Sequence, residues 1–471
     1  MAFDEIPQHF KQWELSTTQG IDGLKLVEDA SIGEVGDEDV VVEMYAASLN
    51  FLDLWVAKAC TLSKRKIRAG GHPGMLELDN NPGLITGCDG AGVVKAVGSA
   101  VTSFTVGEKV VTYLISHIAD DEKVDFTKVG ASIGIATNGT LTQYGKFHVS
   151  NLVHAPKELS FEQAATLPCS ALTAYNALLG LRGRQVEKGQ WVLVQGTGGV
   201  SVAGLQIALA VGAHVVATTS SAEKAAKLRS LGVESVINYR ETPEWGLPAR
   251  ELTPNNAGFD HVLDVGGEIT IGESVKAVKT DGVVTTIGLV GGPTEKQVPI
   301  MAASHHACIV RGIVAGTRQQ MRELVTFVDK VGLKPALDDV EFGIEQVRDA
   351  YWRQEKQQHF SKVVIKLRDR VAFILAGLTA GGGITGYIRA GSVPSMVAGC
   401  SVGLLYALGG YRIQSRATYG VELALLASII LAGSSIPRAM KTQKPLPIGL
   451  STLAAFGLYS FGMAVANGRS A

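Results

Sequence analysis

The sequence predicts an α/β protein in which a doubly wound parallel sheet lies inside a β-rich domain, followed by an all-α membrane domain of four helices. Strands and helices alternate with short links over residues 190–290, and four apolar segments of 18–21 residues follow residue 370. The charge is also divided. The 471 residues carry a net charge of −1, but residues 371–471 hold five Arg, two Lys and one Glu. That end therefore carries +6 and the first 370 residues carry −7.

Charge and cysteine content exclude several classes of protein. Five cysteines without regular spacing do not form the framework of a small disulfide-rich domain. No basic run is long enough for a nucleic-acid-binding arm, so nucleic acid is not an expected partner. Charged residues interrupt the first 22 residues and leave no apolar core for a signal peptide. We therefore expect membrane insertion to be directed from the C-terminal end.

Short apolar runs separated by helical stretches predict the strands of the parallel sheet. Each run has the length of a buried strand, and Gly212 and Gly232 end two of the intervening helices. The expected strands are residues 191–195, 214–218, 235–239, 259–265 and 282–288. This alternation is typical of a doubly wound nucleotide-binding fold.

A glycine-rich turn follows the first of these strands, at residues 196–201 (Gly-Thr-Gly-Gly-Val-Ser). Glycines allow a diphosphate to approach the backbone, and the helix that begins here offers free amides and the positive end of its dipole. In this strand–turn–helix context the turn predicts a dinucleotide site. Ser201 replaces the third glycine of the usual pattern, and a tight turn that binds nothing is the alternative.

The end of the second strand indicates which dinucleotide is bound. NAD sites usually carry Asp or Glu about 20 residues beyond the glycines, where it binds the ribose 2′-hydroxyl. Here the strand ends in Thr-Thr-Ser-Ser at residues 218–221, with Lys224 shortly after. Hydroxyls and a cation suit a 2′-phosphate, so the sequence favours NADPH over NADH. A capping box from Ser220 to Glu223, which any helix can use, is the competing interpretation.

A β-rich pattern surrounds the parallel sheet. Residues 38–115 and 140–155 favour strands joined by glycine-marked turns, and residues 360–367 have the pattern of a closing strand. A β-rich domain interrupted by a nucleotide-binding fold places the active site in the cleft between them.

Several motifs here resemble the medium-chain dehydrogenases/reductases, and more narrowly the quinone-reductase-like branch often labelled zinc-type alcohol dehydrogenase-like. The resemblance rests on residues 164–175, 194–201 and 236–239, and it covers roughly residues 10–368. It implies a GroES-like catalytic domain over residues 1–159 and 301–368 and a Rossmann NADP-binding domain over residues 160–300. The cofactor-binding residues assigned in this way are Gly196, Gly198, Gly199, Val200, Ser220, Ser221, Lys224, Tyr239 and Leu289.

The resemblance also bears on metal content. Zinc alcohol dehydrogenases hold a catalytic zinc with Cys, His and Cys, and these ligands fall here on Asn50, Cys88 and Cys169. Asn is a poor zinc ligand, and no Cys lies between residues 89 and 168 to form a structural zinc site. We therefore expect a metal-free site. A zinc-dependent alcohol dehydrogenase that uses Cys88 and Cys169 is the alternative.

The expected substrate follows from the expected absence of a Lewis acid. Oxidation of a simple alcohol becomes difficult, whereas an electron-poor acceptor can be reduced by the nicotinamide itself. Small apolar quinones and α,β-unsaturated carbonyls, which the resemblance implies, meet this requirement. By resemblance, Asn50 holds the nicotinamide end with Thr173 near it, Leu289 lines the far side of the cleft, and Asp89 orients the pocket. A packing role is the alternative for each residue, and no proton donor other than solvent is evident.

The C-terminal apolar segments are residues 371–388, 393–411, 417–436 and 446–466. Each is long enough to cross a hydrocarbon core of roughly 30 Å at about 1.5 Å per residue. Gly377 and Gly381, Gly382 and Gly386, and Gly399 and Gly403 form three Gly-x-x-x-Gly pairs that favour close helix packing.

The tail resembles the transmembrane protein 14 family, on the run of residues 386–395. That resemblance covers nearly all of residues 371–471 and implies an organelle membrane, with lipid or haem-related traffic. Glu422 is the only acid of the tail and predicts either a functional group in the membrane or an interfacial residue. Seven Lys and Arg flank the segments on the enzyme side and four on the other, which favours a reductase that faces the cytoplasm.

The main hypothesis is an integral, multi-pass membrane protein whose reductase transfers hydride from NADPH to a quinone, an enone or a similar acceptor. In the second, the tail is a lipid or metabolite carrier and the dehydrogenase fold is an NADPH-sensing accessory. In a third, two neighbouring genes have been joined in gene prediction. The expected partners are the acceptor and a lipid bilayer. A homodimer through the reductase domain remains open.

Overall fold

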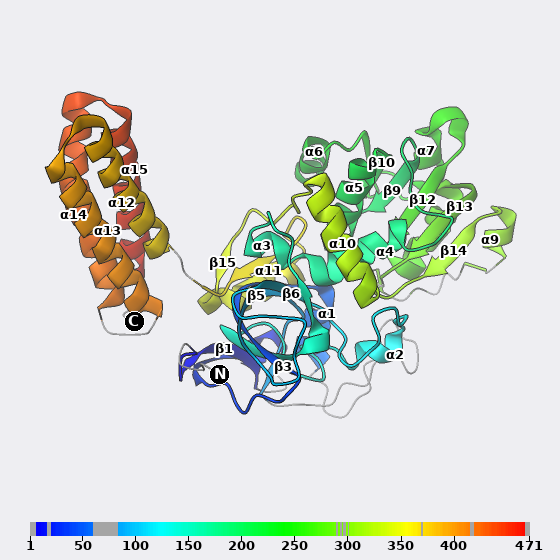
Figure 1. The fold of residues 1–471 in the computed structure, drawn as a ribbon. Helices are drawn as coiled ribbons and strands as arrows, with labels where there is room; N and C mark the ends of the chain where they lie inside the picture. Colours follow the sequence, from blue (N-terminus) through cyan, green and yellow to red (C-terminus); the bar gives the residue numbers. More distant parts are fainter. Residues whose placement is uncertain are drawn as a thin grey trace. The chain divides into compact units, whose positions relative to one another are not determined.

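The computed structural model describes residues 6–16, 20–59, 83–288, 291–292, 294, 298–299, 301–368, 371–414 and 419–466. The chain divides into two compact units, Met1–Leu367 and Arg368–Ala471 (Figure 1). We call them the reductase unit and the tail.

The predicted doubly wound sheet is present in the reductase unit. Among the described residues, six parallel strands have the order β11-β10-β9-β12-β13-β14, and this order reverses between β9 and β12. The strands are β9 (Trp191–Gln195), β10 (His214–Thr219), β11 (Ser235–Asn238), β12 (Phe259–Asp264), β13 (Val278–Thr286) and β14 (Ile309–Gly312). The helices of this part are α4 (Leu172–Leu179), α5 (Gly199–Val211), α6 (Ala222–Ser230), α7 (Gly246–Glu251), α8 (Ile271–Ala277), α9 (Ala302–His305) and α10 (Arg318–Val331). The prediction of this fold class is confirmed.

The parallel sheet extends past residue 300, where the sequence placed the end of the Rossmann domain. β14 pairs with β13 through Val283 and Ile309. The strand was missed because it has four residues, of which Val310 is exposed and Ile309 only half-buried. Among the described strands it lies at the edge of the sheet, and it lacks the continuous apolar run that identifies a buried strand.

The β-rich part is built from both ends of the reductase unit, as expected. Among the described residues, seven strands form one sheet in the order β15-β16-β3-β5-β6-β8, with β7 paired to β3. A smaller sheet has the order β2-β1-β4. The strands are β1 (Phe10–Leu15), β2 (Leu24–Ala30), β3 (Asp39–Ser48), β4 (Leu84–Ile85), β5 (Asp89–Val97), β6 (Lys109–Thr112), β7 (Tyr144–His148), β8 (Leu152–His154), β15 (Phe342–Gly343) and β16 (Val364–Lys366). The helices are α1 (Phe51–Ala59), α2 (Phe126–Val129), α3 (Phe161–Ala164) and α11 (Val347–Glu355).

The two parts of the reductase unit share one hydrophobic core. Val42 of β3, Leu172 of α4 and Val194 of β9 belong to the same cluster of buried side chains. A π-helical turn, Leu167–Ala171, leads into α4. In the sequence it follows β8 of the β-rich sheet and precedes β9 of the parallel sheet. A shared core holds residues from both parts at fixed positions, which an active site at their junction requires.

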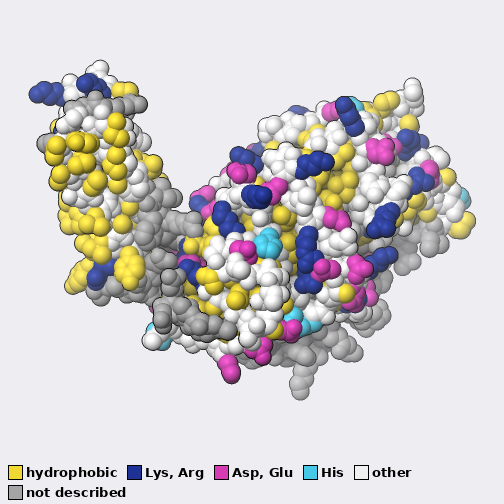
Figure 2. All heavy atoms as spheres, in the orientation of Figure 1, with side chains coloured by type: hydrophobic (Ala, Val, Ile, Leu, Met, Phe, Trp, Pro, Cys, Tyr) yellow, Lys and Arg dark blue, Asp and Glu magenta, His cyan; other side chains and the backbone are white. Residues whose placement is uncertain are grey.

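The tail contains helices at all four predicted segments, within its described residues: α12 (Val371–Ala390), α13 (Val393–Gln414), α14 (Gly420–Thr442) and α15 (Pro445–Ala466). Three described helical stretches are long and apolar enough to cross a membrane: Ser395–Ile413, Gly420–Thr442 and Pro445–Val465. Apolar side chains cover much of the tail's visible described surface (Figure 2). Leu404 and Tyr459 are among the exposed apolar side chains of the tail. Length, composition and exposed apolar surface together indicate membrane association.

Two of the three predicted Gly-x-x-x-Gly pairs lie at helix contacts. A Cβ on Gly399 would lie 2.5 Å from Gly383 Cα, and one on Gly403 would lie 2.9 Å from Ala376 O. Gly382 and Gly386 face Leu450 and Ser395. The prediction is wrong for the pair Gly377 and Gly381, because no described atom lies within 4 Å of a Cβ on either residue. The helical period places this pair away from the packed face of α12.

Candidate active site

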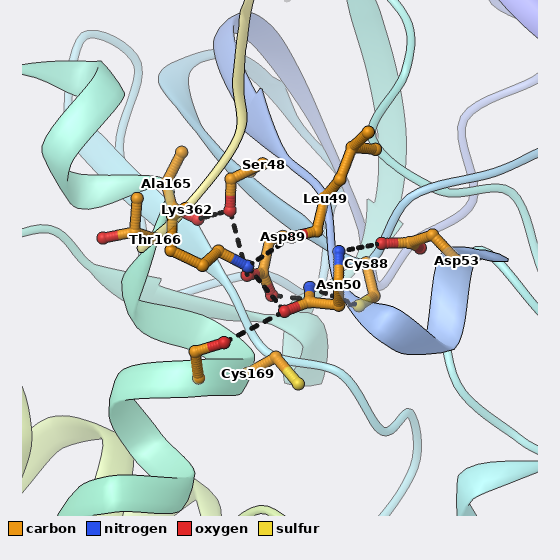
Figure 3. Close-up of polar contacts among 12 residues, drawn as sticks. Ser48, Leu49, Asn50, Asp53, Cys88, Asp89, Ala165, Thr166, Cys169 and Lys362 are labelled. Carbon is orange, nitrogen blue, oxygen red and sulfur yellow. Dashed lines mark hydrogen bonds and ion pairs between the residues drawn. The ribbon is translucent and has the colours of Figure 1, made fainter. Parts of the chain in front are cut away.

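Segments that are distant in the sequence bring polar side chains together in one buried cluster (Figure 3). β3 ends at Ser48, opposite Asp89 at the start of β5, and Asn50 follows in the link to α1. Cys169 lies in the π-helical turn, and Lys362 comes shortly before β16. We call this group the Asn50 cluster. Its members are Ser48, Asn50, Asp53, Cys88, Asp89, Cys169, Ser170 and Lys362.

Lys362 supplies the cation of the Asn50 cluster. Its ammonium donates to Leu49 O at 2.7 Å, to Asn50 Oδ1 at 2.5 Å and to Asp89 Oδ2 at 3.0 Å. The side chains of Lys362 and Asp89 are 4% and 0% exposed, so solvent screens this ion pair very little. The three N–H donors of the ammonium each have an acceptor.

Sequence reasoning did not assign a site role to Lys362. A lysine in the run Ser361-Lys362-Val363 is usually read as the solvent-facing position of a strand. The available signal was that apolar residues flank it on both sides, at Phe360 and at residues 363–365. Ser48, Asp53 and Ser170 were missed as well. Ser48 and Asp53 lie within three residues of Asn50 in the sequence, whereas Ser170 is brought to it only by the fold.

The contacts of Asn50 determine how its amide is oriented. Its Oδ1 accepts from Lys362 and, at 3.2 Å, from Ser170 Oγ. The nitrogen therefore points the other way, and Nδ2 lies 3.5 Å from Cys88 Sγ. A thiol sulfur is a weak acceptor. A stronger acceptor, such as a carbonyl oxygen, would compete for this N–H group.

Burial and hydrogen bonds shift the pKa values of Asp53 and Cys88. Desolvation raises the pKa of Asp53 from 3.8 to about 7; the hydrogen bond from Asn50 N, 2.6 Å long, lowers it, and the Asp89 charge raises it. The pKa of Cys88 is raised well above its ordinary value, first by a hydrogen bond with Cys169 and then by burial and the nearby carboxylates. Cys88 is therefore a neutral thiol at pH 7.

Replacing Asp53 by Asn is expected to stabilise the protein at high pH. An acid whose pKa rises on folding disfavours the folded state when ionised, so stability is lost as the pH rises from 3.8 to about 7. The loss in the wild type is about 4 kcal/mol at most. D53N keeps an oxygen acceptor for Asn50 N and removes this loss.

Unfolding of the full-length D53N protein in detergent micelles, followed from pH 4 to pH 8, measures the effect. The gain over the wild type should increase with pH and level off above pH 7. D29N is the matched control, because Asp29 is an exposed acid of β2. A gain that is the same at pH 4 and pH 8 would contradict the assignment.

The glycine turn has open space where a diphosphate is expected. Gly196 has a φ of +75°, and no described atom lies within 4 Å of a Cβ built on Gly196 or Gly198. Gly198 is the N-cap of α5, and Val200 lies half-buried in its first turn. Gly199 differs, because a Cβ there would lie 2.6 Å from both Lys362 Cδ and Ser170 Oγ. The turn therefore fits a phosphate group on one side and contacts the Asn50 cluster on the other.

The structure changes the competing interpretation of the second strand. Ser221, not Ser220, is the N-cap of α6, and its Oγ accepts from Lys224 N at 3.3 Å. The predicted capping box from Ser220 to Glu223 is therefore wrong by one residue. Ser220 does not cap α6, because the helix begins only after Ser221. Lys224 Nζ donates to Gln357 O at 2.8 Å, and burial lowers its pKa.

The other predicted residues have varied environments. Thr173 is buried in α4, and its Oγ1 donates to Cys169 O at 2.7 Å. Tyr239, directly after β11, is exposed. Leu289 lies outside the described residues. The structure thus gathers Asn50, Cys88, Asp89 and Cys169, with Thr173 one turn beyond Cys169.

Comparison with known proteins identifies the reductase unit. A zinc-type alcohol dehydrogenase-like protein of Schizosaccharomyces pombe is 38% identical over 351 residues, which cover 74% of this chain and 96% of that protein. The chain is a medium-chain dehydrogenase/reductase. Family models described as "alcohol dehydrogenase GroES-like domain" and "zinc-binding dehydrogenase" match residues 36–157 and 199–330 of this dehydrogenase/reductase.

Further relatives agree with this assignment. An NADPH-dependent alkenal/one oxidoreductase of Arabidopsis thaliana is 28% identical, over 76% of this dehydrogenase/reductase and 80% of the plant protein. A solved structure from Sinorhizobium meliloti, described as an alcohol dehydrogenase, is 34% identical with a TM-score of 0.67. It covers 77% of this chain and 100% of its own. The tail matches the family described as "transmembrane proteins 14C" over residues 371–461, so both resemblances are confirmed.

The donor groups of this dehydrogenase/reductase do not fit the zinc ion that its family implies. Zinc is held by thiolates, imidazoles and carboxylates. Asn50, at the position of the first ligand, is a neutral amide whose oxygen binds an ammonium. Among the described residues, no group of three or more His, Cys, Asp or Glu side chains is placed to hold a metal.

Proposed function

We propose that the reductase unit transfers hydride from NADPH to a quinone, an α,β-unsaturated carbonyl or a similar electron-poor acceptor, without zinc. The observation that carries this proposal is the orientation of the Asn50 amide. Lys362 and Ser170 hold its oxygen, so its N–H group faces a weak acceptor, the Cys88 thiol. A relative described as an NADPH-dependent alkenal/one oxidoreductase supports the choice of acceptor.

The residues of the Asn50 cluster have a consistent chemical role. When bound, NADPH supplies hydride, so the acceptor gains two electrons and one proton, NADP⁺ leaves, and a second proton comes from solvent. Asn50 donates Nδ2–H to the acceptor carbonyl oxygen, where negative charge develops. An oriented donor in a buried site stabilises that charge more than water does. Lys362 and Ser170 hold the amide oxygen away from the acceptor, and Asp89 accepts from the Lys362 ammonium, so that only the donor end is presented.

The glycine turn and the start of α6 are the proposed cofactor site. The backbone at Gly196 and Gly198 offers space for the diphosphate, and the N-terminus of α5 offers its amides. Ser220 and Ser221 follow β10, Lys224 lies in the first turn of α6, and the exposed Tyr239 follows β11. The ribose 2′-phosphate is expected at these strand ends. Lys224 supplies the charge that favours the phosphate over a hydroxyl.

Replacing Lys224 by Ala is expected to reduce the preference for NADPH about tenfold, since a hydrogen bond to a charged group contributes about 1.5–3 kcal/mol. The kcat/KM for NADPH should fall while that for NADH stays the same. The matched control is K227A, on the same helix, because Lys227 pairs with Asp339 and Glu223. An unchanged ratio of NADPH to NADH activity in K224A would count against this site.

The tail is proposed to place the reductase at a membrane that contains its acceptor. We propose that it crosses the bilayer several times, with the reductase on the cytoplasmic side. A membrane-bound enzyme meets apolar acceptors at the concentration that they reach in lipid. A homodimer is also proposed, with β14 as the contact, because it ends the parallel sheet among the described strands. Its Val310 is exposed.

Acceptor turnover by the full-length protein in detergent micelles tests the proposed function. NADPH oxidation should occur with enones or quinones and should be slow with simple ketones. Treatment with a zinc chelator should not change the rate, and metal analysis should find far less than one zinc per chain. Activity confined to simple alcohols and ketones, and lost on chelation, would show that the protein is a zinc alcohol dehydrogenase instead.

A further inference from the structure

The segment after β14, residues 313–317, lies where the nicotinamide end of a dinucleotide is expected. We call it the β14 loop. In a doubly wound sheet, ligands bind outside the carboxyl ends of the strands, at the point where the strand order reverses. Here that point is between β9 and β12, and the phosphate-binding turn follows β9. The other half of the dinucleotide therefore falls to the ends of β12, β13 and β14.

Ala315 gives the β14 loop a strained backbone. Its φ is +45°, in the left-handed region that residues with a Cβ rarely adopt. Such a conformation persists only where surrounding contacts hold it. The contacts that hold it here come from α4, from β14 and from Tyr113, directly after β6, whose hydroxyl donates to Gly316 O at 3.0 Å.

Asn176 of α4 makes the contact to Ala315 itself. Its Nδ2 donates to Ala315 O at 2.7 Å. Its Oδ1 accepts from Arg311 at 2.8 Å and from Gln320 at 3.1 Å, and Arg311 also donates to Asn176 O at 2.9 Å. The side chain is buried. Because two donors hold the oxygen, the amide nitrogen can point only toward the loop.

Helix α4 connects this contact to the Asn50 cluster. Ser170, which donates to Asn50 Oδ1, lies in the π-helical turn that leads directly into α4. Asn176 lies six residues further on, which is about 9 Å along a helix. One continuous helical segment therefore holds the proposed hydrogen-bond donor to the acceptor at one end and the β14 loop at the other.

We propose that Asn176, oriented by Arg311, is a positioning residue for hydride transfer. It fixes the β14 loop, and through it the nicotinamide end of the cofactor, at a set distance from Asn50. This inference rests on the proposed function in requiring a nicotinamide cofactor. A displacement of about 1 Å between reacting groups lowers a rate by about 10²-fold, so a small shift of the loop affects hydride transfer strongly. The adenosine end is held by the glycine turn and α6, and is independent of Asn176.

Two variants of the full-length protein in detergent micelles test the inference. N176A removes the whole side chain. N176D keeps an oxygen that accepts from Arg311 but has no N–H group for Ala315 O, so it isolates the contact to the loop. Both should slow hydride transfer about tenfold or more at saturating NADPH and acceptor. The deuterium isotope effect on kcat, with label at C4 of the cofactor, should increase.

Binding measurements separate positioning from general loosening. Affinity for adenosine 2′,5′-bisphosphate, which lacks nicotinamide, should stay at the wild-type value, and the nicotinamide fluorescence of bound NADPH should change. The matched control is Q206A. Gln206 of α5 also holds a loop backbone from both ends of its amide, at Lys334 O (2.8 Å) and Ala336 N (3.0 Å). Q206A should keep the wild-type isotope effect and nicotinamide fluorescence.

The failures of the two proposals are distinguishable. A wild-type protein that binds NADPH but reduces no enone or quinone contradicts the proposed acceptor, and the fluorescence comparison still decides the role of Asn176. Wild-type hydride transfer or unchanged nicotinamide fluorescence in a folded N176D protein would overturn the inference. Equal losses in N176D and Q206A would also overturn it, because they would indicate a structural role only.

Discussion

Replacing Lys362 by Met is expected to lower the free energy of unfolding by about 3–5 kcal/mol and to abolish reductase activity. The substitution leaves Asp89 with a buried, unpaired charge, since its carboxylate is fully buried and receives the Lys362 ammonium at 3.0 Å. It also frees the Asn50 amide to turn, because Lys362 provides the shortest hydrogen bond to its oxygen. Chemical unfolding and acceptor turnover of the full-length protein measure the two effects.

Two further variants separate the effect of charge from that of the lost side chain. The double variant K362M/D89N should recover about half or more of the stability, because it removes the buried charge. It should remain inactive, since Asn50 is still not held. K366M, four residues further along the chain, is the surface control: Lys366 pairs with the exposed Glu341, and such pairs contribute less than about 1 kcal/mol. A K362M protein as stable as K366M would contradict the buried ion pair.

Substitutions at two adjacent glycines are expected to affect different properties: stability and activity at Gly199, and cofactor affinity at Gly198. Gly199→Ala should lower stability by about 1–3 kcal/mol, because its Cβ would overlap Lys362 Cδ and Ser170 Oγ. Both side chains hold Asn50, so activity should fall by at least about tenfold. Gly198→Ala should leave stability within about 0.5 kcal/mol of the wild type, because its φ of −77° suits any residue and the space is open.

The effect of Gly198→Ala should appear in cofactor binding instead. A Cβ at this position occupies the space that the diphosphate needs, so the Kd for NADPH should rise about tenfold or more. Calorimetry or fluorescence titration of the full-length protein measures it. Wild-type affinity in Gly198→Ala would show that the diphosphate does not approach this turn. Wild-type stability and activity in the Gly199→Ala protein would show that the turn and the Asn50 cluster are not in contact.

The parallel sheet was predictable because most residues of its central strands, β9, β10 and β12, are buried. Continuous apolar runs such as β9 identify themselves, and glycines mark the ends of the helices between them. β14 was not predicted, for the opposite reason: it is half-exposed, and its four residues show no hydrophobic pattern typical of a buried strand. The helices of the tail were equally predictable from the sequence, since lipid requires long apolar segments. Which of its glycines touch another helix depended on packing, and Gly377 and Gly381 do not.

The site was only partly predictable. The resemblance to the dehydrogenase family singled out Asn50, Cys88, Asp89 and Cys169, and the structure brings these four residues together. Lys362 was missed because its partners lie more than 270 residues earlier in the chain. That contact depends on the register of the strands, which cannot be read from the spacing of residues in the sequence. The cap of α6 is Ser221 for a similar reason, since the backbone alone decides at which serine the helix begins.

By itself, the sequence determined the two-part organisation, the doubly wound fold, the glycine turn and the apolar tail. These features follow from hydrophobic periodicity and backbone freedom, which are local properties of a chain. Only the tertiary structure decided how the Asn50 amide is oriented, that Gly199 contacts the Asn50 cluster, and that Asn176 holds the β14 loop. Those features depend on hydrogen bonds between residues that are distant in sequence. Their strength comes from burial, and burial exists only once the two parts of the reductase unit have packed around one core.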